Sequence, residues 1–117
     1  MFKEQLLNAF LQGNSLAALT ESAGILLGAP VMVVDEAFRI AASFAAPGGD
    51  YEEYRTAVSH SQLSFEAAAE ISGEAAEKGE DFFEFGRNGR SYRVAVLRNG
   101  GAMIGYMIIV DAGEENT

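Results

Sequence analysis

The chain has 117 residues, 49% apolar and 21% charged, so it is long and apolar enough to form one globular domain with its own core. A formal net charge of -9 argues against direct contact with nucleic acid, because phosphate backbones are bound through Lys and Arg. The lack of cysteine excludes disulfides and thiolate chemistry, and the lack of a signal-peptide core or a long apolar run predicts a cytoplasmic protein without membrane contact.

Two amphipathic helices are expected at the start of the chain. Apolar residues recur at intervals of three and four along the first, at Phe2, Leu6, Leu7, Phe10 and Leu11. Ser15 can cap the second helix, and Gly28 and Pro30 end it. The apolar stripe of this second helix comprises Leu16, Leu19, Ala23, Leu26 and Leu27. A sheet offers only two faces, so we expect a second copy of the chain to cover Phe2, Leu6 and Phe10, which predicts a homodimer.

Two short strands follow, at residues 31–34 and 39–44. The first is rich in β-branched residues and follows Pro30, which disfavours a helix. The connection DEAF at residues 35–38 has no glycine, so a residue such as Asp35 or Glu36 must supply the turn geometry. Residues 45–49, which contain Pro47, are expected to form a loop.

Two further helices are expected between residues 50 and 79. Asp50 and Glu53 match a capping box, after which Tyr51, Tyr54 and Val58 fall on one helical face. Ser64 can cap the next helix, Gly73 predicts a kink or a break near Ser72, and Gly79 can end it. The expected packing face of this helix consists of small side chains together with Phe65, namely Phe65, Ala68, Ala69, Ser72, Ala75 and Ala76. Its acidic residues, Glu66, Glu70, Glu74 and Glu77, are read as a solvated face.

The last third of the chain predicts a three-stranded meander, because Asn-Gly occurs at residues 88–89 and 99–100 between strand-like segments. Two-residue turns would pair Phe85 with Tyr92 and Phe83 with Val94. In the same register Val96 would pair with Met103, and Met107 and Ile109 would join that apolar face. A three-residue Asn-Gly-Gly turn would instead direct Ile104, Tyr106, Ile108 and Val110 to the core. The sequence leaves both registers open.

The element order predicts an α+β fold with a five-stranded antiparallel sheet and helices packed on it, preceded by two amphipathic helices. The last strand is apolar on both faces, which suits the middle of a sheet. Residues 1–112 are expected to form a single sensor-type domain and residues 113–117 a polar tail.

Two segments carry a resemblance to a known family. LLNAFLQGNSLAALTESAGILLGAPVMVVDEAFRIAASF resembles the amino-terminal sensory region of bacterial transcription regulators of the purine-catabolism (PucR) and sugar-diacid type, and MIGYMIIV resembles its closing strand. The resemblance implies a PAS-like or GAF-like sensor domain, usually joined to a helix-turn-helix output domain. The chain departs from the pattern at the second strand, where Phe38 stands before Arg39 in place of the frequent glycine.

Few residues suggest chemistry. His60 is the only histidine and is expected to face solvent, so we predict no catalytic residue, no metal site and no cofactor. Candidate ligand-binding residues are those that would line a cavity between sheet and helices: Tyr51, Tyr54, Arg55, Phe65, Tyr92 and Tyr106. The competing interpretation places these tyrosines in the core. The sequence favours a regulatory domain that binds a small molecule or relays a signal through dimerisation; the alternative is a protein-interaction module without a ligand.

Overall fold

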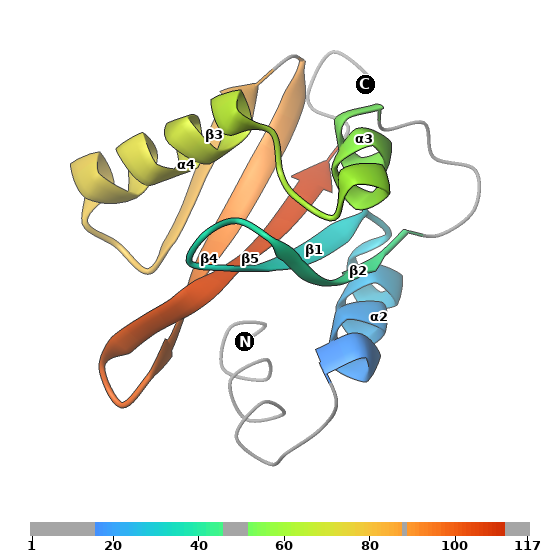
Figure 1. The fold of residues 1–117 in the computed structure, drawn as a ribbon, viewed down its shortest axis with the longest axis horizontal. Coiled ribbons are helices and arrows are strands. Elements are labelled where there is room, and N and C mark those ends of the chain that lie inside the picture. Colours follow the sequence, from blue (N-terminus) through green and yellow to red (C-terminus); the bar gives the residue numbers. More distant parts are fainter. Residues whose placement is uncertain (1–15, 46–51, 88, 112–117) are drawn as a thin grey trace.

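The computed structural model describes residues 16–45, 52–87 and 89–111. These residues form three α-helices and a five-stranded sheet (Figure 1). In chain order the elements are α2 (Leu16–Leu27), β1 (Val31–Asp35), β2 (Ile40–Phe44), α3 (Glu52–His60), α4 (Phe65–Lys78), β3 (Phe82–Arg87), β4 (Arg90–Asn99) and β5 (Ala102–Asp111). The expected first helix, with Phe2, Leu6 and Phe10, lies outside the described residues.

All neighbouring strands are antiparallel, in the order β2-β1-β5-β4-β3. The predicted α+β fold is therefore confirmed, and β5 lies in the middle of the sheet as its two apolar faces indicated. Residues 105–110 of β5 are all buried, because β1 and β4 flank the strand and both faces of the sheet are packed.

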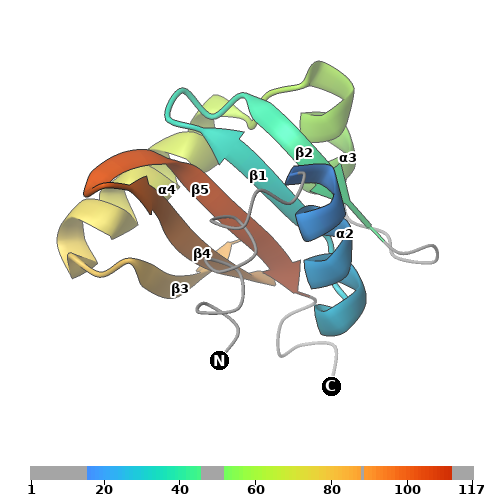
Figure 2. The same ribbon diagram turned by 90° about the horizontal axis from the view of Figure 1, so that it is seen from below.

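Helices lie on both faces of the sheet (Figure 2). We call the cluster beneath α3 and α4 the α4-side core; it consists of Met32, Val34, Ala57, Leu63, Ala67, Ile71, Phe83, Tyr92, Val94, Val96, Tyr106, Ile108 and Val110. The α2-side core consists of Leu19, Ala23, Ala29, Val31, Val33, Ala95, Leu97, Met107 and Ile109. Alternate residues of one strand enter opposite cores, as the two-residue period of a strand requires.

The first predicted hairpin register is correct. Phe85 pairs with Tyr92 and Phe83 with Val94, and Gly89 in the turn has φ 74. The rings of Phe85 and Tyr92 stack with centroids 5.5 Å apart, so the pairing also orders aromatic packing on this face.

The second hairpin follows neither predicted register in full. Asn99 pairs with Ala102, so the turn is Gly100-Gly101, with φ 63 and 89, and not Asn99-Gly100. The pairing then shifts between Leu97 and Arg98. After the shift, Tyr106, Ile108 and Val110 enter the α4-side core, whereas Met107 and Ile109 enter the α2-side core. Ile104 packs against the α2-side core and Met103 against the α4-side core.

The helices bury different residues from those predicted. In α4 the buried residues are Ala67 and Ile71, because Ile71 covers more apolar area than any alanine. In α2, Leu26 is 68% exposed, although Leu19 and Ala23 are buried as expected. The helix is not broken near Ser72, since α4 is continuous from Phe65 to Lys78.

The predicted ends of α4 are confirmed. The Ser64 Oγ accepts a hydrogen bond from the Ala67 N–H at 3.2 Å, which caps the first turn. Gly79 ends the helix with φ 63.

Candidate functional site

A half-open groove of about 460 Å³ lies between the β1–β2 turn, the α3–α4 link and the first half of α4. Its lining residues are Ala37, Phe38, Gln62, Leu63, Phe65, Ala68, Ala69 and Ser72. The volume falls in the range usual for small-molecule sites, and an apolar wall with a few polar groups is their usual composition. We therefore take this groove as the candidate site.

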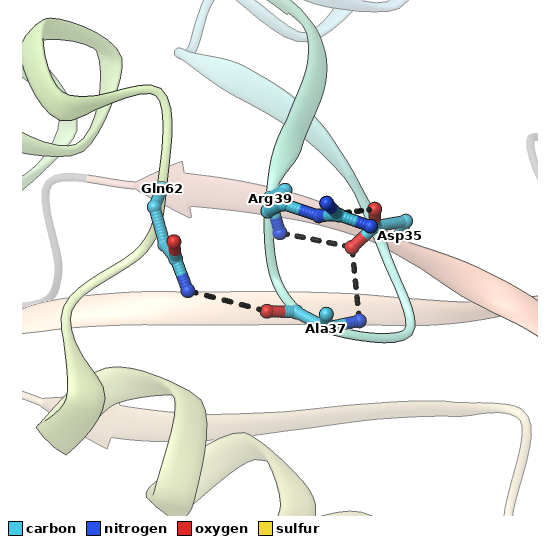
Figure 3. A network of polar contacts seen from close by, with 4 residues as sticks. All are labelled: Asp35, Ala37, Arg39 and Gln62. Carbon is cyan, nitrogen blue, oxygen red and sulfur yellow. Dashed lines mark hydrogen bonds and ion pairs between the residues drawn. The ribbon is translucent and has the colours of Figure 1, made fainter.

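The turn that forms one wall is organised by the Asp35 carboxylate (Figure 3). Its Oδ1 accepts hydrogen bonds from the N–H groups of Ala37 and Arg39 at 2.9 and 3.0 Å, and its Oδ2 accepts one from Arg39 Nε at 3.1 Å. The hydrogen bond from the Arg39 backbone is the largest cause that holds the pKa of Asp35 below its ordinary value of 3.8. Asp35 thus supplies the hydrogen bonds of a turn that has no glycine.

The left-handed conformation in this turn belongs to Phe38, whose φ is 64. Glycine adopts this conformation without strain, whereas a bulky side chain is disfavoured there. The ring of Phe38 stacks on that of Tyr106 in β5, with centroids 5.1 Å apart and planes at 13°. This packing offsets the backbone strain and links the groove wall to the central strand.

The α3–α4 link forms a short ladder with the turn. The Leu63 N–H donates to the Phe38 carbonyl and the Ile40 N–H to the Ser61 carbonyl, both at 3.0 Å. Ser61 has φ 57. Phe38 and Ser61 are the non-glycine residues with positive φ within the described ranges, and the ladder joins the two segments that contain them. The Gln62 side chain extends from the link toward the turn, and its Nε2 is 3.4 Å from the Ala37 carbonyl oxygen (Figure 3).

The residues predicted to bind a ligand do not gather in one place. Phe65 lines the groove and is 83% exposed. Tyr92 and Tyr106 belong to the α4-side core, and Tyr54 packs against it. Arg55 is exposed and lies in a separate shallow hollow of about 340 Å³ with Thr56, Ser59 and His60. Tyr51 is outside the described residues.

Sequence reasoning missed Phe38, Gln62 and Leu63 as lining residues. The signal at Phe38 was its place in a turn without glycine, ahead of Arg39. Gln62 and Leu63 could not be placed, because their position depends on the ladder between the turn and the link.

Other site types find little support in the part of the chain that the structure describes. It contains no group of three His, Asp or Glu side chains arranged to hold a metal ion. His60 is exposed, and its Nδ1 lies 2.9 Å from the Thr56 carbonyl oxygen of the same helix. None of the described helices has the length and apolar character needed to cross a membrane.

Comparison with known proteins does not identify a family for the chain: no family model matches it, and no curated protein matches it significantly.

Proposed function

We propose that this chain is a sensory domain of a bacterial transcription regulator of the kind it resembles, and that a small molecule binds in the groove beside α4. The groove itself carries the proposal: it lies where the β1–β2 turn and the α3–α4 link meet α4, and it has the size and lining of a ligand site. The α+β fold with a central last strand agrees with the class of domain that the resemblance implies.

The proposed signal is a shift between two packings of the helices on the sheet. A ligand in the groove would contact α4 through Ala69 and Ser72 and the sheet through Phe38, which stacks on Tyr106. A molecule that binds one arrangement of these elements more tightly would favour it and so bias an attached output domain.

A thermal-shift screen against charged and uncharged small molecules, including purine metabolites, sugar diacids, amino acids and neutral aromatic amides and alcohols, tests the proposal, because a ligand that binds only the native state raises Tm. Ala69→Phe fills the groove from an exposed helical position and should abolish the shift. The matched control is Ala76→Phe, on the same helix, exposed and outside the groove lining, which should keep the shift. The absence of any hit at millimolar concentration, or an equal shift in Ala69→Phe, would contradict ligand binding in this groove.

The alternative is a dimerisation or protein-interaction module without a ligand. Three large apolar side chains favour it, since Ile25, Leu26 and Phe65 are 64%, 68% and 83% exposed. Sedimentation of the wild type, Phe10→Glu and Ile25→Glu tests this alternative. If the wild type is a dimer and Phe10→Glu is a monomer, the predicted homodimer through Phe2, Leu6 and Phe10 is supported. If Ile25→Glu is the monomer instead, the contact between the two copies lies on α2. A wild type that is monomeric at high concentration would exclude the homodimer.

A further inference from the structure

We infer that the groove selects an uncharged molecule that combines an apolar ring or chain with one amide or hydroxyl group, and that it disfavours anions. This inference rests on the proposed function and specifies its ligand class. Its first support is the lining: none of the eight side chains around the groove is charged. A charged ligand would lose hydration on entering and would meet no opposite charge from the lining.

Three cations of the β1–β2 turn, α4 and β3 already have acidic partners. Arg39 pairs with Asp35, Arg87 with Glu70, and Lys78 with Glu74, at 3.1, 2.9 and 3.1 Å. Each of these cations lies in the turn, on α4 or at the end of β3. A carboxylate ligand would have to compete with an existing partner for any of them.

The nearby acidic residues add repulsion. Glu36 and Glu66 are the sequence neighbours of the lining residues Ala37 and Phe65, and both are exposed. Neither forms an ion pair with another described residue. With a formal net charge of -9 for the whole chain, the potential at the groove is expected to be negative.

The polar groups of the lining fit a neutral ligand. Gln62 provides an amide, whose Nε2 makes only a long contact of 3.4 Å with the Ala37 carbonyl, and Ser72 provides a hydroxyl. Both side chains can donate or accept a hydrogen bond, and both are exposed enough to turn toward a ligand. The amide or hydroxyl of the ligand would bind here while its apolar part contacts Phe38, Leu63 and Phe65.

Three probes with one ring and different charges test the inference: benzamide, benzoate and benzylamine. Each is titrated into the full ¹⁵N-labelled chain at neutral pH, and the amide shifts of Gln62, Phe65, Ala69 and Ser72 are followed. We expect benzamide to bind with a Kd at least about fivefold lower than that of benzoate or benzylamine. Gln62→Leu should weaken benzamide binding by about fivefold, the effect of one hydrogen bond.

The controls separate the two proposals. Ala69→Phe should abolish the benzamide shifts, whereas Ala76→Phe should retain them. If benzoate or benzylamine binds the groove as tightly as benzamide, the charge selectivity is wrong while the groove remains a binding site. If none of the three probes shifts these amides up to its solubility limit, the groove as a ligand site is refuted together with the inference.

Discussion

The ring of Phe38 stacks on that of Tyr106 although the backbone of Phe38 is left-handed, with φ 64. Phe38 therefore contributes packing through its side chain and strain through its backbone. The two contributions act in opposite directions on the free energy of unfolding and can be separated by two substitutions that both remove the ring.

Phe38→Ala should destabilise the protein by about 2 kcal/mol, because it deletes a half-buried ring from the α4-side core and keeps a Cβ at a left-handed position. Phe38→Gly deletes the same ring but removes the strain, so it should be more stable than Phe38→Ala by about 1 kcal/mol. Urea unfolding followed by circular dichroism measures both differences. An alanine variant as stable as the glycine variant would mean that Phe38 is not strained.

Gly105 is expected to be intolerant of any side chain. A Cβ at this position would overlap the Val34 carbonyl oxygen and lie 3.2 Å from the Asp35 Cα, and both are backbone atoms of the paired strand. Gly105→Ala should therefore cost about 3 kcal/mol in unfolding free energy, since β1 and β5 would have to separate locally.

Gly73 provides the matched control for Gly105, because its Cβ would meet nothing within 4 Å. It lies in the interior of α4, where alanine is favoured over glycine, so Gly73→Ala should raise the unfolding free energy by up to about 1 kcal/mol. The same urea titration compares the two variants. Equal effects would contradict the close approach of β1 and β5.

The Asp35 carboxylate should make stability depend on pH. Its pKa in the folded state lies below the ordinary value of 3.8, so the charged form is favoured by folding. The resulting stabilisation should be fully present above the unfolded-state pKa and lost as the pH falls through the folded-state pKa. The stability advantage of the wild type over Asp35→Asn should thus be constant from neutral pH to about pH 5 and shrink at lower pH.

Urea unfolding of both proteins at pH 7 and at pH 3 measures this effect. The control is Glu36→Gln, which removes the neighbouring exposed carboxylate. The turn N–H groups of Ala37 and Arg39 donate to Asp35 and not to Glu36. This variant should differ little from the wild type at pH 7. An advantage over Asp35→Asn that grows as the pH falls would contradict the proposed role of the Asp35 carboxylate.

The fold was predictable because its main signals are local. The apolar run of β5 indicated a central strand, and Ser64 and Gly79 marked the ends of α4. The buried face of α4 was predicted wrongly because the alanine pattern fits more than one face. The contact with the sheet selects Ala67 and Ile71.

The groove was less predictable because it is assembled from three segments. Phe65 was selected as an aromatic residue near the helices, and it does line the groove. Tyr92 was selected for the same reason, but it fills the core, since its pairing with Phe85 directs the ring beneath α4. Side-chain type alone does not distinguish a residue that lines a groove from one that fills the interior.

The turn of the last hairpin, Gly100-Gly101, contains Gly101 in a left-handed conformation with φ 89. Gly101→Ala should lower the unfolding free energy by about 1–2 kcal/mol, because a Cβ is disfavoured in this conformation even though it would meet nothing within 4 Å. Gly86→Ala is the control. Gly86 lies in β3 without a positive φ, and an added Cβ would lie 3.9 Å from the Arg90 carbonyl oxygen. The unfolding free energy of this variant should therefore change little. A turn at Asn99-Gly100 would place Gly101 in the strand, and Gly101→Ala would then be as mild as Gly86→Ala in urea unfolding.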